Sequence, residues 1–227
     1  MKTTKFRSML TSLLLGMVTT VAVLGCGNLA SQPPSILPAK AAAQAAAKTG
    51  KSVVVYFSLH GNDKNPADID ASTAASVLIH DSKHLGTTQY MAQQVARLTG
   101  SDLQSIEVTD VYPAGFQDVI DKNHEEMHRD AFPSLKTTPD ISGYDTVYIG
   151  YPVWATTIPR PVATFIRDND FRGKTVIPFC THDGYNSGSS YRDIGSLATG
   201  AVMKPGLAVE AHDVAGSEGT IKKWLGI

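Results

Sequence analysis

The chain has 227 residues, of which 42% are hydrophobic and 18% charged, and its formal net charge at pH 7 is −1. This composition is typical of a folded soluble domain and excludes a disordered chain. It offers no basic stripe with interleaved aromatic residues, which argues against a nucleic-acid partner. The two cysteines, Cys26 and Cys180, are too few for a disulfide framework, and Cys180 ends an apolar run where a buried thiol is expected.

The first 26 residues have the pattern of a bacterial export signal. A start with three basic residues is followed by an apolar run over 9–25, which closes with Val23-Leu24-Gly25-Cys26. This ending resembles a lipobox, although Leu24 stands where a small residue is usual. The pattern predicts lipidation of Cys26 and an extracytoplasmic, membrane-anchored protein at the cell surface or in the periplasm. The alternative is an uncleaved signal anchor, for which a run of about 17 residues is barely long enough.

The next segment, residues 27–50, is rich in Ala, Pro and Ser and shows no apolar periodicity of the kind found in folded domains. It is expected to form a flexible tether between the anchor and the domain. The folded domain is therefore expected over residues 51–227, which is the size of a single domain.

Within the domain, β-rich runs alternate with segments of helical periodicity. The expected strands are Ser52–Ser58, Leu103–Val108, Thr146–Tyr151, Thr175–Cys180 and Val202–Val209. The expected helices are Thr87–Thr99, Phe116–Arg129, Pro159–Arg167, Ser189–Leu197 and Ser217–Leu225. Alternation of this kind predicts an α/β fold of three layers, in which helices cover both faces of a doubly wound, five-stranded parallel sheet.

The first strand ends in a loop that looks like the start of a phosphate site. Ser58 ends the strand and Gly61-Asn62 follows, but Asp63 comes next instead of a helix and would repel a phosphate. Gly61-Asn62 is therefore expected to form a turn.

The missing helix begins later in the chain, at Gly86-Thr87-Thr88. The free amides and the dipole of a helix start favour an anion, and two threonine hydroxyls add donors. We therefore interpret the phosphate site as split between Ser58 and this helix start, with 59 to about 83 as an insertion long enough to lie over the site. The alternative is that Thr87 only caps its helix.

Two further loops leave strand ends at the same edge of the predicted sheet, where ligands of doubly wound proteins bind. They lie in the segments YIGYPVWATTIPRPVATFI, from residue 148, and FRGKTVIPFCTHDGYNSG, from residue 171. With the Gly-Thr-Thr helix start, these segments resemble the bacterial branch of the flavodoxin-like FMN-binding family, which has GYPxW and PFCTH loops. The resemblance covers residues 52–226. It implies the strand order 2-1-3-4-5 and bound FMN.

The resemblance also implies which residues contact FMN. The phosphate would be held by Ser58, Gly86, Thr87 and Thr88. One side of the isoalloxazine ring would be lined by Pro152, Val153, Trp154, Ala155 and Thr156. The other side, with backbone groups bonding the pyrimidine edge, would be formed by Thr181, His182, Asp183 and Gly184. Alternatives remain: Trp154 as a core residue, His182 as a loop hydrogen-bonding group, and Tyr185 as either a shield of the ring or an exposed side chain.

The sequence departs from the family pattern at three points. The insertion splits the first loop, and Ala155 replaces a residue that is often aromatic, which leaves Trp154 as the aromatic residue of that loop able to stack on the ring. Asp183 stands where a small residue is common, and its carboxylate would disfavour an anionic reduced flavin.

A competing motif, HEEMH, runs from His124 to His128 and matches the H-E-x-x-H pattern of zinc peptidases. On a helix both histidines would share one face, with Glu125 as general base. The positions that would complete the longer pattern are Ala131 and Ser134, so a third ligand is missing. We therefore expect no catalytic metal at this motif.

These patterns together predict an FMN flavoprotein that acts in electron transfer or in reduction of a small acceptor such as a quinone, with a small-molecule or protein redox partner. The flavin would carry the electrons while the protein supplies binding, orientation and electrostatics. The alternative is a binding module of flavodoxin fold without redox activity.

Overall fold

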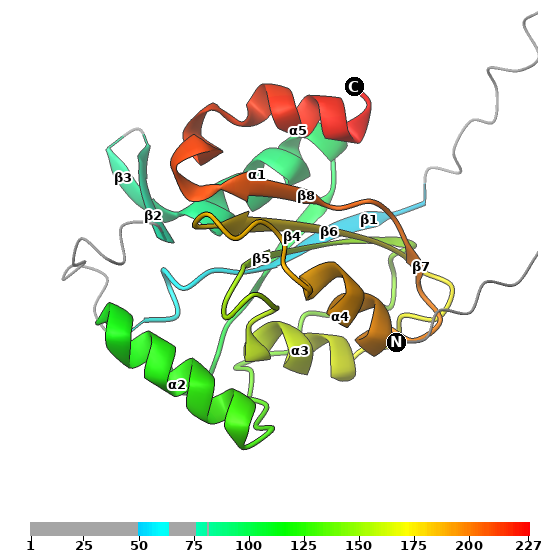
Figure 1. Ribbon diagram of the computed structural model, residues 1–227. Coiled ribbons are helices and arrows are strands. Elements are labelled where there is room, and N and C mark those ends of the chain that lie inside the picture. Colours follow the sequence, from blue (N-terminus) through cyan, green and yellow to red (C-terminus); the bar gives the residue numbers. More distant parts are fainter. Residues whose placement is uncertain (1–49, 64–75, 81) are drawn as a thin grey trace, which may run out of the picture. The chain divides into compact units, whose positions relative to one another are not determined.

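The computed structural model describes residues 50–63, 76–80 and 82–227, and a parallel sheet forms the centre of this region (Figure 1). Its strands are β1 (Ser52–Phe57), β4 (Asp102–Ile106), β5 (Thr146–Pro152), β6 (Thr175–His182), β7 (Val202–Met203) and β8 (Leu207–Glu210). They lie in the order β4-β1-β5-β6, and β7 and β8 both pair in parallel with β6. Counted along the chain, this is the expected order 2-1-3-4-5, and the predicted fold class is confirmed.

The expected last strand is divided into β7 and β8 by Lys204-Pro205-Gly206. A proline has no N–H to donate to a neighbouring strand, so pairing cannot continue through Pro205. The two short strands therefore occupy successive stretches of the same edge of β6.

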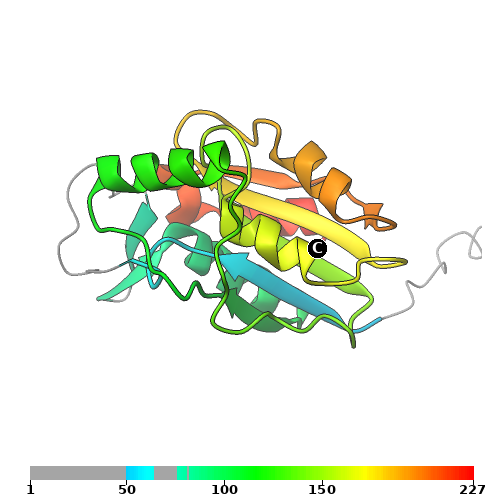
Figure 2. The same ribbon diagram turned by 90° about the horizontal axis from the view of Figure 1, so that it is seen from below.

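Helices cover the sheet on both faces. They are α1 (Thr87–Thr99), α2 (Phe116–His128), α3 (Arg160–Arg167), α4 (Ser190–Leu197) and α5 (Glu218–Leu225), and a 3-10 helix, η2, spans Ala211–Gly216. Helices α1 and α5 lie on one face, while α3 and α4 lie on the other, which Figure 2 views from their side. The α-helices lie where the periodicity predicts them, whereas η2 was not expected.

The first strand shows why helices are needed on both faces. Val53, Val55 and Phe57 belong to the core under α3 and α4, and Val54 and Tyr56 belong to the core under α1 and α5. Successive side chains of a strand point to opposite faces, so a run of consecutive apolar residues must be covered twice.

A two-stranded antiparallel hairpin, β2 (Val77–His80) with β3 (Lys83–Gly86), precedes α1 and was not expected from the sequence. It lies within the predicted insertion, and β3 runs directly into α1. The hairpin lies at the carboxyl edge of the sheet, on the α1 side (Figure 1), and its second strand ends at Gly86.

Helix α2 stands apart from the sheet at the same edge, on the α3 side (Figures 1 and 2). Within it only Val119, Asn123 and Glu126 are buried. The Tyr112 hydroxyl donates to the Glu126 carboxylate at 2.8 Å, and Lys122 pairs with Asp110 at 2.9 Å. These polar contacts add to the packing of Val119 against the core in holding α2 in place.

Several expectations lie outside the described residues: lipidation at Cys26, the tether up to residue 49, and the part of the insertion over 64–75. In the part of the chain that the structure describes, no helix has the length and apolar character needed to cross a bilayer.

Candidate functional site

The first contact at the carboxyl edge joins Ser58 to Gly86. A Cβ atom at Gly86 would overlap the Ser58 Oγ, so only glycine allows the end of β3 to pass this close to the end of β1. Both residues are buried. The two halves of the predicted split site therefore meet, although 27 intervening positions separate them in the sequence.

A second set of contacts joins the start of α1 to the other two loops. The hydroxyls of Thr88 and Thr181 lie 2.7 Å apart in a hydrogen bond, and the Val153 N–H donates to the Thr181 carbonyl at 2.8 Å. Thr181 is the penultimate residue of β6, and Val153 follows β5 directly. The sequence-predicted segments thus converge at one edge of the sheet.

The start of α1 is capped by Gly86, which has no side chain to cover the helix amides. The Gln89 side chain accepts from the Gly86 N–H at 3.1 Å, and Thr87 is the first helical residue rather than the cap. The Thr88 hydroxyl is buried against Thr181, so what Thr88 offers an anion is its backbone N–H. A helix start of this kind favours a negative charge.

Trp154 lies half-buried over the end of β1. Its ring meets Phe57 at 5.5 Å and Tyr112 at 5.1 Å between centroids, with interplanar angles of 89° and 78°. These edge-to-face contacts tie Trp154 to the core, which the core-residue interpretation anticipated. The same contacts fix its indole at the edge that carries Ser58, the residue following Phe57.

The loop after β5 is held in a strained turn. Trp154 and Thr157 exchange two backbone hydrogen bonds, of 3.1 and 2.9 Å, around Ala155 and Thr156, whose φ angles are 45° and 63°. Residues other than glycine rarely adopt positive φ, and each such residue costs about 1–2 kcal/mol. Strain of this kind is retained where the surroundings impose it, which is common at binding sites.

The strained turn at Ala155 and Thr156 is held by contacts with residues just before α4 and within it. The Thr156 carbonyl accepts from the Ser189 N–H at 2.8 Å, and a Cβ at Gly188 would overlap that carbonyl. Asp193 accepts hydrogen bonds from the hydroxyls of Thr157, at 2.6 Å, and Ser189, at 2.5 Å. The second and third loops are therefore locked to each other.

The third loop runs from a buried start to an exposed tip. Thr181 is buried, His182 is partly exposed, and Asp183, Gly184 and Tyr185 are exposed. The Tyr185 side chain is 74% exposed and has no role in the core. This exposure is compatible with both readings of Tyr185, which stay predictions.

Two histidines at this edge carry an unsatisfied nitrogen. Within the described part of the chain, the buried side-chain nitrogen and oxygen atoms without a hydrogen-bond partner are His60 Nδ1 and His182 Nδ1. His60 follows the end of β1, and His182 ends β6. An enclosed polar atom without a partner costs about 1–3 kcal/mol, and a bound water, ion or ligand is what would complete its hydrogen bonding.

Asn62 organises the first loop, and its role was missed by the sequence reasoning. Its side-chain amide donates to the carbonyls of Ser58, at 2.9 Å, and Ile106, at 3.1 Å, and its oxygen accepts from the Val108 N–H at 2.9 Å. The Asn62 N–H also closes a turn onto Leu59 O at 2.8 Å, which confirms the turn expected at Gly61-Asn62. A buried asparagine that joins two strand ends leaves no periodic signal in the sequence.

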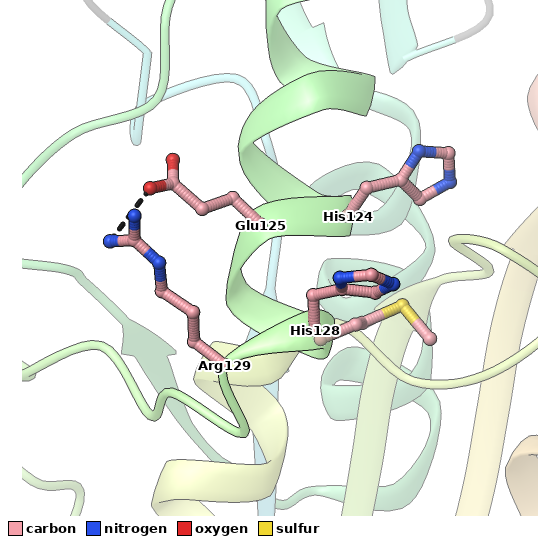
Figure 3. Close-up of a pocket in the computed structure, with 5 residues that line it drawn as sticks. His124, Glu125, His128 and Arg129 are labelled. Carbon is pink, nitrogen blue, oxygen red and sulfur yellow. Dashed lines mark ion pairs between the residues drawn. The ribbon is translucent and has the colours of Figure 1, made fainter.

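The HEEMH motif lies on the exposed side of α2, beside an open cavity of about 540 Å³ (Figure 3). His124 and His128 project from one side of the helix, whereas Glu125 projects from the other and pairs with Arg129 at 2.8 Å. The Glu125 carboxylate is thus paired with Arg129 and not turned toward the imidazoles.

Elsewhere in the described ranges, one group of three side chains is spaced to share a metal ion: Glu210, His212 and Asp213. It includes neither His124 nor His128, so the HEEMH histidines gain no third ligand from it. The imidazole of His212 already lies between the two carboxylates, 3.6 Å from Glu210 and 3.3 Å from Asp213.

Comparisons with known proteins agree with this geometry. A family model described as flavodoxin matches residues 76–226. The structure of a proposed flavoprotein from Bacteroides uniformis is 26% identical, with a TM-score of 0.58, and the match covers 78% of this chain and 99% of that one. A flavoprotein from Lactobacillus acidophilus, solved in complex with FMN, is 18% identical, with a TM-score of 0.52 over 74% of this chain and 97% of that one. No curated protein sequence matches the chain.

Proposed function

Because the chain belongs to the flavodoxin family, whose model matches residues 76–226, we propose that it binds FMN at the carboxyl edge of its sheet. The observation that carries this proposal is the meeting of Ser58, the α1 start and Thr181 at the edge where Trp154 lies. The Lactobacillus acidophilus flavoprotein of similar fold supports it, because that protein was solved with FMN.

The residues at this edge fit a flavin nucleotide in two respects. The glycine at position 86 lets the Ser58 hydroxyl lie directly against the start of α1, so this hydroxyl and the helix amides can face one anion. The enclosed Nδ1 atoms of His60 and His182 lack partners that polar groups of a ligand would supply.

In this arrangement each loop has a separate task. The phosphate docks at Ser58 and the amides of Gly86, Thr87 and Thr88, where the dipole of α1 offsets its charge. One side of the ring would be lined by Pro152, Val153, Trp154, Ala155 and Thr156, in a loop whose turn is tied by backbone hydrogen bonds to the residues before α4. Thr181, His182, Asp183 and Gly184 line the other side.

The bound flavin would supply the redox chemistry, by one-electron transfer or by two-electron reduction of a small acceptor such as a quinone. The protein's own part is to bind and orient the ring and to set its electrostatics. The exposed carboxylate of Asp183 lies in the loop expected beside the ring, and it would disfavour a negative charge on the reduced form.

Visible absorption and ligand titration test this function. The purified full chain is expected to be yellow, or to quench the fluorescence of added FMN with saturable 1:1 stoichiometry. A colourless protein that takes up neither FMN nor riboflavin would instead support a flavodoxin-fold binding module without redox activity.

We also propose that the chain is exported and anchored to a membrane through a lipidated Cys26. The support is the lipobox-like stretch Val23-Leu24-Gly25-Cys26 after an apolar run. The Cys26→Ser variant is expected to lose incorporation of labelled fatty acid and to leave the membrane fraction. The matched control is Cys180→Ser, because Cys180 is buried in β6 and cannot accept a lipid. Retained label in Cys26→Ser would refute the anchor.

A further inference from the structure

The HEEMH motif, which the flavin site does not use, brings three candidate metal ligands to one face of α2. His124, Met127 and His128 stand at positions i, i+3 and i+4, and side chains at these spacings are neighbours on a helix surface. The two imidazoles project from the same side of the helix (Figure 3). All three side chains line the open cavity of about 540 Å³ beside α2. Two imidazoles and a thioether therefore share one solvent-accessible space.

These three groups are available to a metal ion. His124 and His128 are exposed, and neither makes a hydrogen bond or an ion pair with another residue of the described ranges. Met127 is partly exposed, and its sulfur accepts from the amide of the buried Asn123 at 3.6 Å. This weak hydrogen bond holds the thioether in place and leaves the sulfur a second lone pair for a metal.

The charged neighbours on α2 are paired with one another rather than with the imidazoles. Arg129 pairs with Glu125 at 2.8 Å on the other side of the helix (Figure 3), and Lys122 pairs with Asp110 at 2.9 Å. The positive charges of Arg129 and Lys122 are thus offset near the imidazoles. Because Glu125 is turned away, it is not placed as a general base, and the motif is suited to hold a metal ion rather than to hydrolyse a substrate with it.

We propose that His124, Met127 and His128 form a copper site on α2. Imidazole is a good ligand for zinc, nickel and copper, and among the divalent ions of this series Cu²⁺ is bound most tightly. A thioether is a soft ligand that selects Cu⁺. Structural zinc instead takes four ligands, which these three residues do not complete. The imidazoles bind copper in both oxidation states, and the thioether adds a ligand for Cu⁺.

Titration of the full chain with Cu²⁺ against a competing chelator, on protein without a histidine tag, tests the imidazoles. We expect one Cu²⁺ per chain with a Kd of about 1 µM or tighter, and nitrogen splitting in the EPR spectrum of the bound ion. His124→Gln and His128→Gln are each expected to weaken binding about tenfold or more, since only one imidazole remains. Zn²⁺ and Ni²⁺ are expected to bind the wild-type chain more weakly than Cu²⁺.

Met127→Leu tests the thioether. In the Cys26→Ser background, which removes the thiol outside the domain, competition with a Cu⁺ indicator is expected to show a Cu⁺ affinity about tenfold lower in Met127→Leu. Its Cu²⁺ affinity is expected to stay within about twofold of wild type, because both imidazoles are kept. Leucine has similar volume and helix propensity, so the substitution removes little besides the sulfur.

His212→Gln is the matched control. His212 belongs, with Glu210 and Asp213, to the other set of side chains in the described ranges that are spaced to share a metal ion. This variant is expected to keep the Cu²⁺ affinity of wild type. Thermal unfolding identifies any variant that does not fold, and Cu²⁺ is expected to raise the Tm of wild type and of His212→Gln but not of the double variant His124→Gln/His128→Gln.

Three results would overturn the copper site. Binding weaker than about 1 µM would remove it, and binding that persists in both His124→Gln and His128→Gln would place the ion elsewhere on the chain. An unchanged Cu⁺ affinity in Met127→Leu would show that the thioether is not a ligand. None of these measurements depends on flavin binding, so failure of the copper site leaves the proposed function standing.

Discussion

At the scale of single residues, Thr88 and Thr181 show how a residue expected to hold a ligand also joins two elements. Their hydroxyls bond to each other at 2.7 Å, and both side chains are buried. The bond connects the first turn of α1 to the end of β6. It therefore sets the distance between the helix start and the loop that contains His182.

Replacement of each threonine by valine tests this bond. Thr88→Val or Thr181→Val alone leaves the other hydroxyl buried without a partner, and each is expected to lower the free energy of unfolding by about 1–3 kcal/mol. The double variant is expected to lose less than the sum, because neither unpaired hydroxyl remains. Denaturant unfolding of the four proteins measures the coupling, and strictly additive losses would contradict a direct bond.

At the scale of elements, α2 depends on a buried carboxylate for its position. Glu126 accepts from the Tyr112 hydroxyl at 2.8 Å, and the Tyr112 ring in turn contacts Trp154 at 5.1 Å. Burial raises the pKa of Glu126, against the opposing effects of the Tyr112 hydrogen bond and the charges of Lys122 and Arg160. Helix α2 is thus linked to the aromatic cluster below the candidate ring site.

Because this pKa is raised on folding, the contribution of Glu126 to the free energy of unfolding depends on pH. A carboxyl whose pKa is higher in the folded state binds its proton more tightly there, so its contribution to stability is full below the unfolded pKa. That contribution is lost as the pH rises through the folded pKa, which lies above the usual glutamate range. Glu126→Gln keeps an acceptor for Tyr112 and removes the titration.

The difference between the free energy of unfolding of Glu126→Gln and that of wild type is therefore expected to shift in favour of the variant as the pH rises from about 4 to about 7. Glu125→Gln, an exposed carboxylate on the same helix, is the matched control. Denaturant unfolding across this pH range measures both variants. Parallel curves for wild type and Glu126→Gln would show that Glu126 does not titrate differently on folding.

The elements also show how far the sequence could predict the structure. Helix α1 has the predicted bounds, Thr87–Thr99, because its apolar spacing and the glycine after it mark it without ambiguity. The hairpin β2–β3 was missed, since its short strands have exposed positions such as Ile79 and no alternation of burial. Strand β7 was merged with β8 because a proline between them was read as part of one run.

The candidate site was predictable to a similar degree. The position of its loops follows from the topology, because parallel strands bring their carboxyl ends to one edge of the sheet. Contacts such as Asn62 with Val108, or the enclosed nitrogen of His60, depend on tertiary geometry between segments distant in sequence. Neither leaves a pattern of spacing or composition, so sequence reasoning could not find them.

At the scale of the whole domain, the candidate site and the chain's entry lie at opposite edges of the sheet. Strand β1 begins at Ser52, whereas Ser58 follows its carboxyl end, the edge at which the hairpin β2–β3 lies (Figure 1). One strand of six residues, which spans about 20 Å, therefore separates the start of β1 from the site.

In the proposed site, the start of α1 holds one end of a flavin nucleotide and Trp154 lies beside the other. The most direct measurement is a titration of the full chain with FMN and with riboflavin, repeated for Thr87→Ala and Trp154→Ala. Thr87→Ala is expected to weaken FMN more than riboflavin, since Thr87 belongs to the phosphate end, and Trp154→Ala is expected to weaken both alike. Equal losses of the two compounds in Thr87→Ala, or unchanged affinities in Trp154→Ala, would contradict the account.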